Sequence, residues 1–251
     1  MSQSKHLPLS TPQGAHRSDW LVETRRLGKF FHPGSTREVR ALEDVSIGVA
    51  RGSFTALVGP SGSGKTTLLG LLGAMEKPTE GNVLFEDRDL TNCSEAELAR
   101  VRRRIGFIFQ NFSLIARLPL WENITWPLVP RGISTAQRRA ISEQLLNRFD
   151  LADKAHRRPE ELSGGEQQRA AVARALCGEP LLVLADEPTS NLDQDGAERL
   201  QLLLSQIRLE GTTVVVSTHD QRLVAMADTV HRLRHGRLLA PGSEAAGSRG
   251  D

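Results

Sequence analysis

The feature that most constrains this chain is a glycine-rich segment at positions 59–66, which reads GPSGSGKT. It matches the G-x-x-x-x-G-K-[ST] pattern of a phosphate-binding loop, in which glycines let backbone N–H groups turn inward around phosphate oxygens. Lys65 would supply a positive charge beside the phosphates, and Thr66 would offer a hydroxyl to Mg²⁺. The predicted phosphate-binding residues are Gly59, Pro60, Ser61, Gly62, Ser63, Gly64, Lys65, Thr66 and Thr67.

A phosphate loop of this kind lies between a strand and a helix, and the flanking sequence provides both. Residues 54–58 (FTALV) are an apolar run typical of a buried strand, and the helix is expected from Thr66 to about Met75. The sequence therefore predicts a strand–loop–helix unit.

Three further apolar runs each end in polar residues. They are Ile105–Phe109 before Gln110, Leu181–Ala185 before Asp186 and Glu187, and Thr213–Thr218 before His219. Continuous hydrophobicity is typical of strands covered on both faces, as in a parallel sheet. In open α/β sheets the ligand crevice lies beyond the carboxyl ends of the strands. We therefore expect all four strands to deliver their polar residues to one edge.

The adjacent carboxylates of Asp186 and Glu187 point in different directions and can do different work. Asp186 suits the holding of Mg²⁺ at the phosphates, and Glu187 suits the general base that polarises the attacking water. Gln110 could bind Mg²⁺ or orient that water, and His219 could hydrogen-bond the γ-phosphate. Such roles fit phosphoryl transfer, which depends chiefly on positioning and charge stabilisation. The predicted catalytic residues are Glu187, His219, Gln110 and Lys65, and the predicted metal ligands are Thr66, Gln110 and Asp186.

A second glycine-rich segment, LSGGEQQ at 162–168, contains a capping box formed by Ser163 and Glu166. Gly164 and Gly165 lower helix propensity by roughly 1 kcal/mol each relative to alanine in a helix interior. They leave bare N–H groups at the positive end of a helix dipole, which is an anion site. Because one nucleotide needs one phosphate loop, this extra site could serve a nucleotide held by another chain.

The chain is long enough for one large domain or two small ones. Its net charge of +2 gives no strong attraction to nucleic acid or membrane surfaces. No run approaches the ~18 apolar residues of a membrane span, and two cysteines indicate no disulfide framework or metal site. We predict an ATPase domain over 21–240 with a helical subdomain inserted at about 92–169. Residues 1–20 and 241–251 are predicted to be flexible.

Taken together and in order, these motifs resemble the nucleotide-binding subunit of an ABC transporter. The order is phosphate loop, Gln110, the signature at 162–168, the acidic strand end at 181–187, SNLD at 190–193 and His219. The resemblance implies an α/β P-loop ATPase core, with a mostly parallel sheet, flanking helices, an N-terminal antiparallel β portion and the inserted helical subdomain. It implies ATP and Mg²⁺ as cofactors.

In that family two subunits pair head to tail and enclose two ATP molecules, each between the phosphate loop of one subunit and the signature of the other. This gives Ser163, Gly164 and Gly165 a role in the partner's site. The family also stacks an aromatic ring on adenine, for which Phe31 fits and Phe30 is the alternative. Adenine stacking needs only the ring, so phenylalanine can replace the more common tyrosine.

The amino-acid sequences of the motifs resemble those of the macrolide-exporter and lipoprotein-releasing type. They depart at Ser190, where glycine is common, and in the segment from Trp121 to Pro127. The resemblance implies a separate integral-membrane permease, a homodimer and a position on the cytoplasmic face of the cell membrane. It places the permease's coupling helix in a groove just after Gln110. Trp121 and Trp126 either line this groove or fill the core of the subdomain.

The rival hypothesis is a soluble ABC-type ATPase that acts on nucleic acid or ribosomes. The gap between Thr66 and Leu162 holds no sustained heptads of the kind that a coiled-coil DNA-repair member would carry, and the chain has one set of motifs rather than two. A regulatory cassette that binds ATP without turnover is disfavoured by Glu187 and His219. We therefore expect no nucleic-acid partner.

Overall fold

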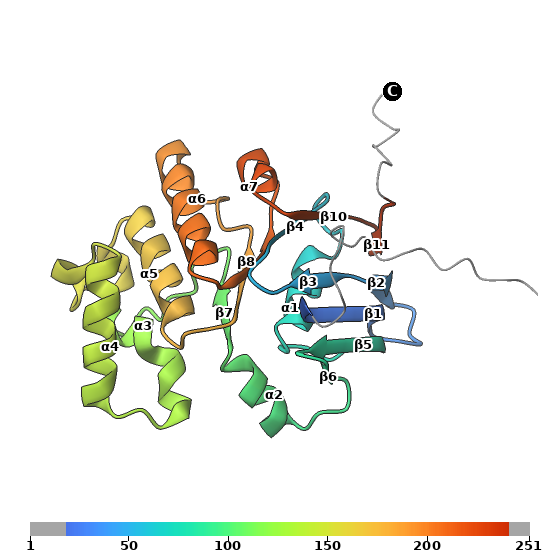
Figure 1. Ribbon diagram of the computed structural model, residues 1–251, viewed down its shortest axis with the longest axis horizontal. Coiled ribbons are helices and arrows are strands. Elements are labelled where there is room, and N and C mark those ends of the chain that lie inside the picture. The colour runs from blue at the N-terminus through green and yellow to red at the C-terminus, as the bar shows by residue number, and fades with distance from the viewer. Residues whose placement is uncertain (1–18, 241–251) are drawn as a thin grey trace, which may run out of the picture.

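The computed structural model describes residues 19–240, which form two sheets joined by helices (Figure 1). The first sheet is antiparallel and has the order β2-β1-β5-β6, with β3 also paired to β1. Its strands are β1 (Trp20–Phe31), β2 (Val39–Val45), β3 (Gly48–Ala50), β5 (Glu80–Phe85) and β6 (Arg88–Asp89). This sheet is the N-terminal antiparallel portion that the resemblance predicted.

The second sheet has the order β11-β10-β4-β9-β8-β7 and is parallel except for the β10–β11 pair. Its strands are β4 (Phe54–Val58), β7 (Ile105–Ile108), β8 (Leu182–Asp186), β9 (Thr213–Ser217), β10 (Thr229–Arg234) and β11 (Arg237–Leu238). Every residue of β4, β8 and β9 is buried. This is why these strands read as continuous rather than alternating apolar runs.

The helices separate the strands along the chain. They are α1 (Lys65–Leu72), α2 (Glu95–Arg102), α3 (Leu120–Thr125), α4 (Thr135–Arg148), α5 (Gly164–Leu176), α6 (Gln194–Leu209) and α7 (Gln221–Ala225). Short 3₁₀ turns occur at η2 (Trp126–Arg131), η3 (Ala152–Lys154) and η4 (Pro159–Glu161). Helices α3, α4 and α5 gather at the end of the molecule opposite the antiparallel sheet, as Figure 1 shows.

Polar caps fix where several helices begin. Ser94, Ser134 and Ser163 each form a capping box, at the start of α2, α4 and α5, respectively. Asp193 accepts a hydrogen bond from the backbone N–H of Gly196 (2.8 Å) and caps α6. Each such cap supplies a partner for a helix N–H group that has none within the helix.

The core lies on both faces of the parallel sheet. One buried cluster joins β4, β8 and β9 to α5, α6 and the helices of the subdomain, and the other joins the opposite faces of those strands to α1, α2 and the antiparallel sheet. Alternate residues of one strand therefore belong to different clusters, as with Ala56 in the first and Leu57 in the second. The phosphate loop is thereby anchored on a strand fixed from both sides.

The predicted fold class is confirmed, and the structure refines the predicted subdomain. The range 92–169 contains β7, which pairs with β8 and belongs to the core sheet. The uninterrupted helical part therefore begins after β7, at Leu120, and continues through α5 to Leu176. Residues 1–18 and 241–251 of the predicted flexible ends lie outside the described residues, whereas Trp20 already belongs to β1.

Candidate nucleotide-binding site

A cavity of about 590 Å³ lies at the carboxyl edge of the parallel sheet. Adjacent parallel strands in the order β4-β9-β8-β7 end there, so residues far apart in the chain converge, as expected from the sequence. The residues that line the cavity are Val39, Arg40, Ala41, Ser61, Gly62, Ser63, Gly64, Lys65, Thr66, Thr67, Gln110, Glu187, Ser190, His219, His235 and Gly236.

The phosphate loop follows β4 and leads into α1. Gly64 adopts a φ of +103°, and a Cβ atom placed on it would lie 2.6 Å from the carbonyl oxygen of Ala41. Both the left-handed backbone and the close approach therefore require glycine at this position. The turn ends at the first residues of α1, whose free N–H groups and dipole favour an anion. The buried hydroxyl of Ser63 has no hydrogen-bond partner in the described part of the chain.

Lys65 is the centre of the charged groups in the cavity. Its ammonium donates to the carbonyl oxygens of Gly59 (2.8 Å) and Pro60 (3.3 Å). The same nitrogen lies 3.4 Å from Glu187 Oε1 and 3.3 Å from His219 Nε2, and His219 Nε2 lies 3.1 Å from Glu187 Oε1. Three predicted catalytic residues, one at the start of α1 and two just beyond β8 and β9, are therefore in mutual contact.

Ser217 holds the Asp186 carboxylate and the backbone of Glu187 in place, a role that sequence reasoning missed. Its hydroxyl donates to Asp186 Oδ1 (2.5 Å) and accepts from the backbone N–H of Glu187 (3.0 Å). Glu187 has a φ of +43°, so its backbone is left-handed and its side chain leaves the line of the strand. No local pattern in the sequence marks Ser217, because it meets Asp186 only through the pairing of β9 with β8.

The predicted metal ligands offer a hydroxyl, an amide oxygen and a carboxylate, the hard oxygen donors that Mg²⁺ prefers. Thr66 and Gln110 line the cavity, and Asp186 lies beside it at the end of β8. One oxygen of Asp186 accepts from Ser217, and among the described residues no hydrogen bond to the other is found. The residues present therefore fit a magnesium ion.

Gln110 is fixed through its backbone, which leaves its side chain free to meet a ligand. The Asn191 amide donates to the Gln110 carbonyl oxygen (2.8 Å) and lies 3.3 Å from Asn111 Oδ1. Arg174, on α5, donates to the carbonyl oxygens of Phe112 (2.6 Å) and Ser113 (2.5 Å) just beyond. In the sequence Asn191 stands out only as part of the SNLD motif, and no pattern marks Arg174.

The signature residues lie apart from this cavity. Ser163, Gly164 and Gly165 start α5, and none of them lines the cavity. The backbone N–H of Ser163 donates to Glu166 (2.7 Å), and this bond lowers the pKa of Glu166 below its usual value. A Cβ atom on Gly164 would meet no atom within 4 Å. Packing within the chain therefore does not demand glycine there.

The predicted adenine platform is close to the cavity but is not among its lining residues. Phe31 ends β1 and pairs with Val39 of β2, which does line the cavity. Lys29 lies over the Phe31 ring, with 5.2 Å to the ring centroid, and Arg40 lies over Phe30 at 4.9 Å. Phe31 stays the predicted adenine contact, with Phe30 as the alternative.

The two tryptophans after Gln110 have different environments. Trp121 is 6% exposed, belongs to the core of the subdomain and is covered by Arg139 at 4.6 Å. Trp126 is 45% exposed. Neither ring lines the second cavity, of about 400 Å³, that lies between α2, β7 and the subdomain, whereas Pro127 and Pro130 do. Trp121 therefore fills the core of the subdomain, whereas Trp126 does not.

A parallel sheet with a phosphate loop, a converging lysine, glutamate and histidine, and a helical insertion defines a P-loop ATPase. The chain matches the ABC transporter family over residues 42–190. It is 42% identical over 219 residues to an ABC transporter ATP-binding protein of Thermotoga maritima, covering 87% of this chain and 93% of that protein. The chain therefore belongs to the ABC transporter family, as an ATP-binding cassette that hydrolyses ATP.

The chain is also similar to an export protein and to a cassette of known structure. The macrolide export ATP-binding/permease protein MacB of Hyphomonas neptunium is 39% identical over 221 residues, which cover 88% of this chain and 34% of MacB. The chain thus spans about a third of that relative. The dimeric ATP-binding cassette MJ0796, solved with ADP and Pi, superposes with a TM-score of 0.80 at 36% identity, covering 86% of this chain and 96% of that chain. No helix among residues 19–240 is long and apolar enough to cross a membrane.

Proposed function

We propose that two copies of this chain close around two Mg²⁺-ATP molecules and drive a separate integral-membrane permease in export. The observation that carries the proposal is the contact of Lys65, Glu187 and His219 in one cavity while the signature lies outside it. A site with its own phosphate loop but without its signature is completed by a second chain. The dimeric cassette MJ0796 supports a paired assembly, and the MacB relatives support export. Release of lipoproteins is the alternative task.

Each residue has a chemical role in this proposal. The phosphate loop and Lys65 hold the β- and γ-phosphates, and Thr66, Gln110 and Asp186 would hold Mg²⁺. The bound ion supplies charge neutralisation at the phosphate oxygens. Glu187 accepts the proton of the attacking water, and His219 donates a hydrogen bond to the γ-phosphate. Phe31 stacks on adenine, and Ser163, Gly164 and Gly165 close over the partner's γ-phosphate through helix N–H groups.

The proposed function also implies a partner and a location in the cell. The permease is a separate chain that places a coupling helix in the groove between α2, β7 and the subdomain. The ATPase pair would then sit on the cytoplasmic face of the cell membrane. Residues 21–240 form the ATPase domain, and no nucleic acid takes part.

The Glu187→Gln variant tests the hydrolytic part of the proposal. It keeps the shape of the side chain and removes the base, so we expect ATP binding to persist and turnover to fall by ~10²-fold or more. ATP should then hold the pair together, which size-exclusion chromatography with and without ATP measures. The control is Glu179→Gln, the same substitution at an exposed glutamate that does not line the cavity. Normal turnover in Glu187→Gln would contradict the assignment of the base.

Mixed dimers test whether the signature acts on the partner's nucleotide. A Lys65→Ala chain lacks a working phosphate loop, and a Gly164→Glu chain places a negative charge in the signature, where the fold has room for a side chain. If the signature acts in trans, the mixed dimer contains one intact site and recovers hydrolysis that neither variant shows alone. If instead each chain completes its own site, the mixed dimer contains no intact site and does not recover hydrolysis.

A further inference from the structure

The turn between β10 and β11 places a histidine on the wall of the nucleotide cavity. Building on the proposed function, in which this cavity holds the nucleotide, we propose that the imidazole of His235 hydrogen-bonds a hydroxyl of the nucleotide's ribose. His235 and its neighbour Gly236 both line the cavity. Neither belongs to the phosphate loop, the signature or the acidic strand end. The structure thus adds a binding residue that lies outside the sequence motifs.

The conformation of the turn explains its glycine but not its histidine. Arg234 pairs with Arg237, so the loop consists of His235 and Gly236 only. Their φ angles are +49° and +74°. Two-residue hairpin turns with both φ angles positive prefer the sequences Asn-Gly, Asp-Gly and Gly-Gly. Turn geometry therefore accounts for Gly236 and leaves the imidazole of His235 without a structural reason.

The turn is bonded to the phosphate loop on one side and to β2 on the other. The backbone N–H of Gly236 donates to the carbonyl oxygen of Ser63 (3.1 Å), and its carbonyl oxygen accepts from the backbone N–H of Glu43 (2.8 Å). A Cβ atom on Gly236 would lie 2.7 Å from the carbonyl oxygen of Ala41, so the turn also packs closely on β2. His235 is therefore presented from a fixed backbone rather than from a free loop.

This position lies between the two ends of a bound nucleotide. Ser63 belongs to the loop that would hold the phosphates. Strand β2 begins with Val39, which pairs with Phe31, the predicted adenine contact. Because the turn connects the phosphate loop with β2, a side chain on it lies beside the part of the nucleotide that links the phosphates to adenine. That part is the ribose, whose hydroxyl groups both donate and accept hydrogen bonds.

His235 has its ring atoms available for such a bond. Of the cavity-lining side chains that β2 and the turn provide, only those of Arg40 and His235 are polar. Arg40 Nε donates to Glu38 Oε1 (2.9 Å), and its guanidinium lies 4.9 Å from the Phe30 ring centroid. Among residues 19–240, the exposed His235 ring has no hydrogen bond or ion pair. A neutral imidazole offers one N–H donor and one acceptor nitrogen, which suits a hydroxyl.

Removal of the ring from an intact turn tests the proposal. His235→Gly deletes the imidazole and suits the left-handed φ of this position, so the turn should be kept. Calorimetric titration with ADP measures the affinity without ATP hydrolysis during the experiment. We expect the dissociation constant to rise by about 3- to 10-fold, the effect of one neutral hydrogen bond. The KM for ATP should rise while kcat stays unchanged, because the lost bond is made in the ground state and the transition state alike.

Nucleotides that lack one hydroxyl locate the contact on the ribose. ADP is compared with 2′-deoxyADP and 3′-deoxyADP on the unaltered chain and on His235→Gly. For one of the two analogues the substitution should cause no further loss of affinity, because the bond is already absent. An equal loss for ADP and both analogues would place the ring elsewhere on the nucleotide and overturn the inference. Unaltered ADP affinity in His235→Gly would overturn it as well.

Asp87→Gly is the matched control. Asp87 lies in the two-residue turn between β5 and β6, and it also has a left-handed φ, of +60°. It is exposed and does not line the cavity. ADP affinity should therefore stay unchanged in this variant, and circular dichroism checks the fold of both glycine variants.

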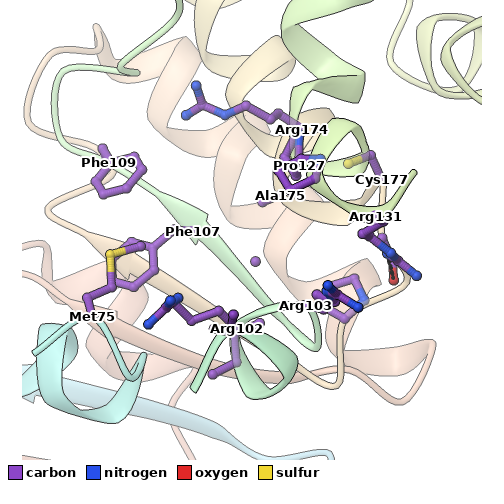
Figure 2. Close-up of a pocket in the computed structure, with 16 residues that line it drawn as sticks. Met75, Arg102, Arg103, Phe107, Phe109, Pro127, Arg131, Arg174, Ala175 and Cys177 are labelled. Carbon is purple, nitrogen blue, oxygen red and sulfur yellow. Dashed lines mark hydrogen bonds between the residues drawn. The ribbon is translucent and has the colours of Figure 1, made fainter. Parts of the chain in front are cut away.

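Lys65→Ala distinguishes failure of this inference from failure of the proposed site. If Lys65→Ala weakens ADP binding and His235→Gly does not, the site is right and the role of His235 is wrong. If neither variant changes the affinity, the nucleotide binds elsewhere and the proposed site is wrong too. The second cavity, where Figure 2 shows Arg103 and Arg131, also offers positive charge. Weaker ADP binding in Arg103→Ala with Arg131→Ala would then place the nucleotide there.

Discussion

The ammonium nitrogen of Lys65 lies 3.4 Å from Glu187 Oε1, and the Lys65 side chain is buried (7% exposed) while that of Glu187 is partly buried (17% exposed). At such burial the attraction is screened less than it would be on the surface. The residue that would hold the phosphates and the residue that would activate water therefore constrain each other. Phosphate oxygens entering the loop would share the Lys65 ammonium with Glu187.

Replacement of Lys65 by alanine should weaken ATP binding. Hydrogen bonds to a charged partner contribute about 1.5–3 kcal/mol, which corresponds to a dissociation constant ~10- to 150-fold higher. Calorimetric titration with ATP measures the change, and circular dichroism checks the fold. Lys77→Ala is a suitable control, because that lysine bonds the Cys93 carbonyl and does not line the cavity. Equal ATP affinity in Lys65→Ala and Lys77→Ala would contradict the role of Lys65.

Loss of the Ser217 hydroxyl should reduce kcat by roughly tenfold, the effect of about 1.4 kcal/mol on the barrier. Ser217→Ala removes the hydroxyl that bonds Asp186, so that carboxylate loses a fixed position, whereas the Glu187 N–H keeps its bond to the carbonyl oxygen of residue 217. The Mg²⁺ concentration for half-maximal activity should rise as well, which a merely structural serine would not cause. Ser217→Thr keeps the hydroxyl and should recover activity.

The control for Ser217 is Ser53→Ala, which removes a hydroxyl bonded to the Ala50 carbonyl just before β4, away from the nucleotide edge. This variant should leave kcat and the Mg²⁺ dependence unchanged. A folded Ser217→Ala protein with unaltered kcat and unaltered Mg²⁺ dependence would remove Ser217 from the site.

The two subdomain tryptophans should differ in their effect on stability. Trp121→Ala deletes a buried ring and its contacts with Arg138 and Arg139, and should lower the free energy of unfolding by about 3–5 kcal/mol. Trp126→Ala changes an exposed ring and should stay within about 0.5 kcal/mol. Urea unfolding of both variants measures the difference. Similar losses in the two variants would contradict the placement of Trp121 in the core.

Buried His231 should make the protein less stable in acid. It is 2% exposed on β10, pairs with Leu57 of β4, and burial lowers its pKa from 6.5 to about 4. The unfolded chain therefore binds a proton between these values while the folded chain does not, so stability is full above pH 6.5 and falls as the pH drops. Between pH 7.5 and 5 this histidine should remove about 2 kcal/mol from the free energy of unfolding.

Urea unfolding at the two pH values tests this expectation with two variants. His231→Gln cannot titrate and should show a smaller loss of stability between pH 7.5 and 5. His156→Gln alters an exposed histidine and should keep the full loss. An unchanged pH dependence in His231→Gln would show that other groups cause it.

Much of the site could be predicted because its motifs are local. The phosphate loop, the capping box at Ser163 and the apolar runs before Asp186 and His219 each depend on neighbours a few residues away. The subdomain boundary was harder, since β7 lies between helices in the sequence and joins the core only through its pairing with β8. The adenine contact of Phe31 stays a prediction, because it depends on how β1 and β2 present their ends to a nucleotide.

The sequence by itself determined the class of fold, the order of the motifs and the identity of the chemistry-bearing residues, because strand hydrophobicity, glycine conformation and helix caps are local properties. Only the tertiary structure decided that Ser217 joins the Asp186 carboxylate to the Glu187 backbone and that Arg174 holds the Gln110 loop. It also decided that Trp121 lies in the core and Trp126 at the surface. The hydrogen bonds of Ser217 and Arg174 join segments between 30 and 62 positions apart, which only the pairing of strands and the packing of helices bring together.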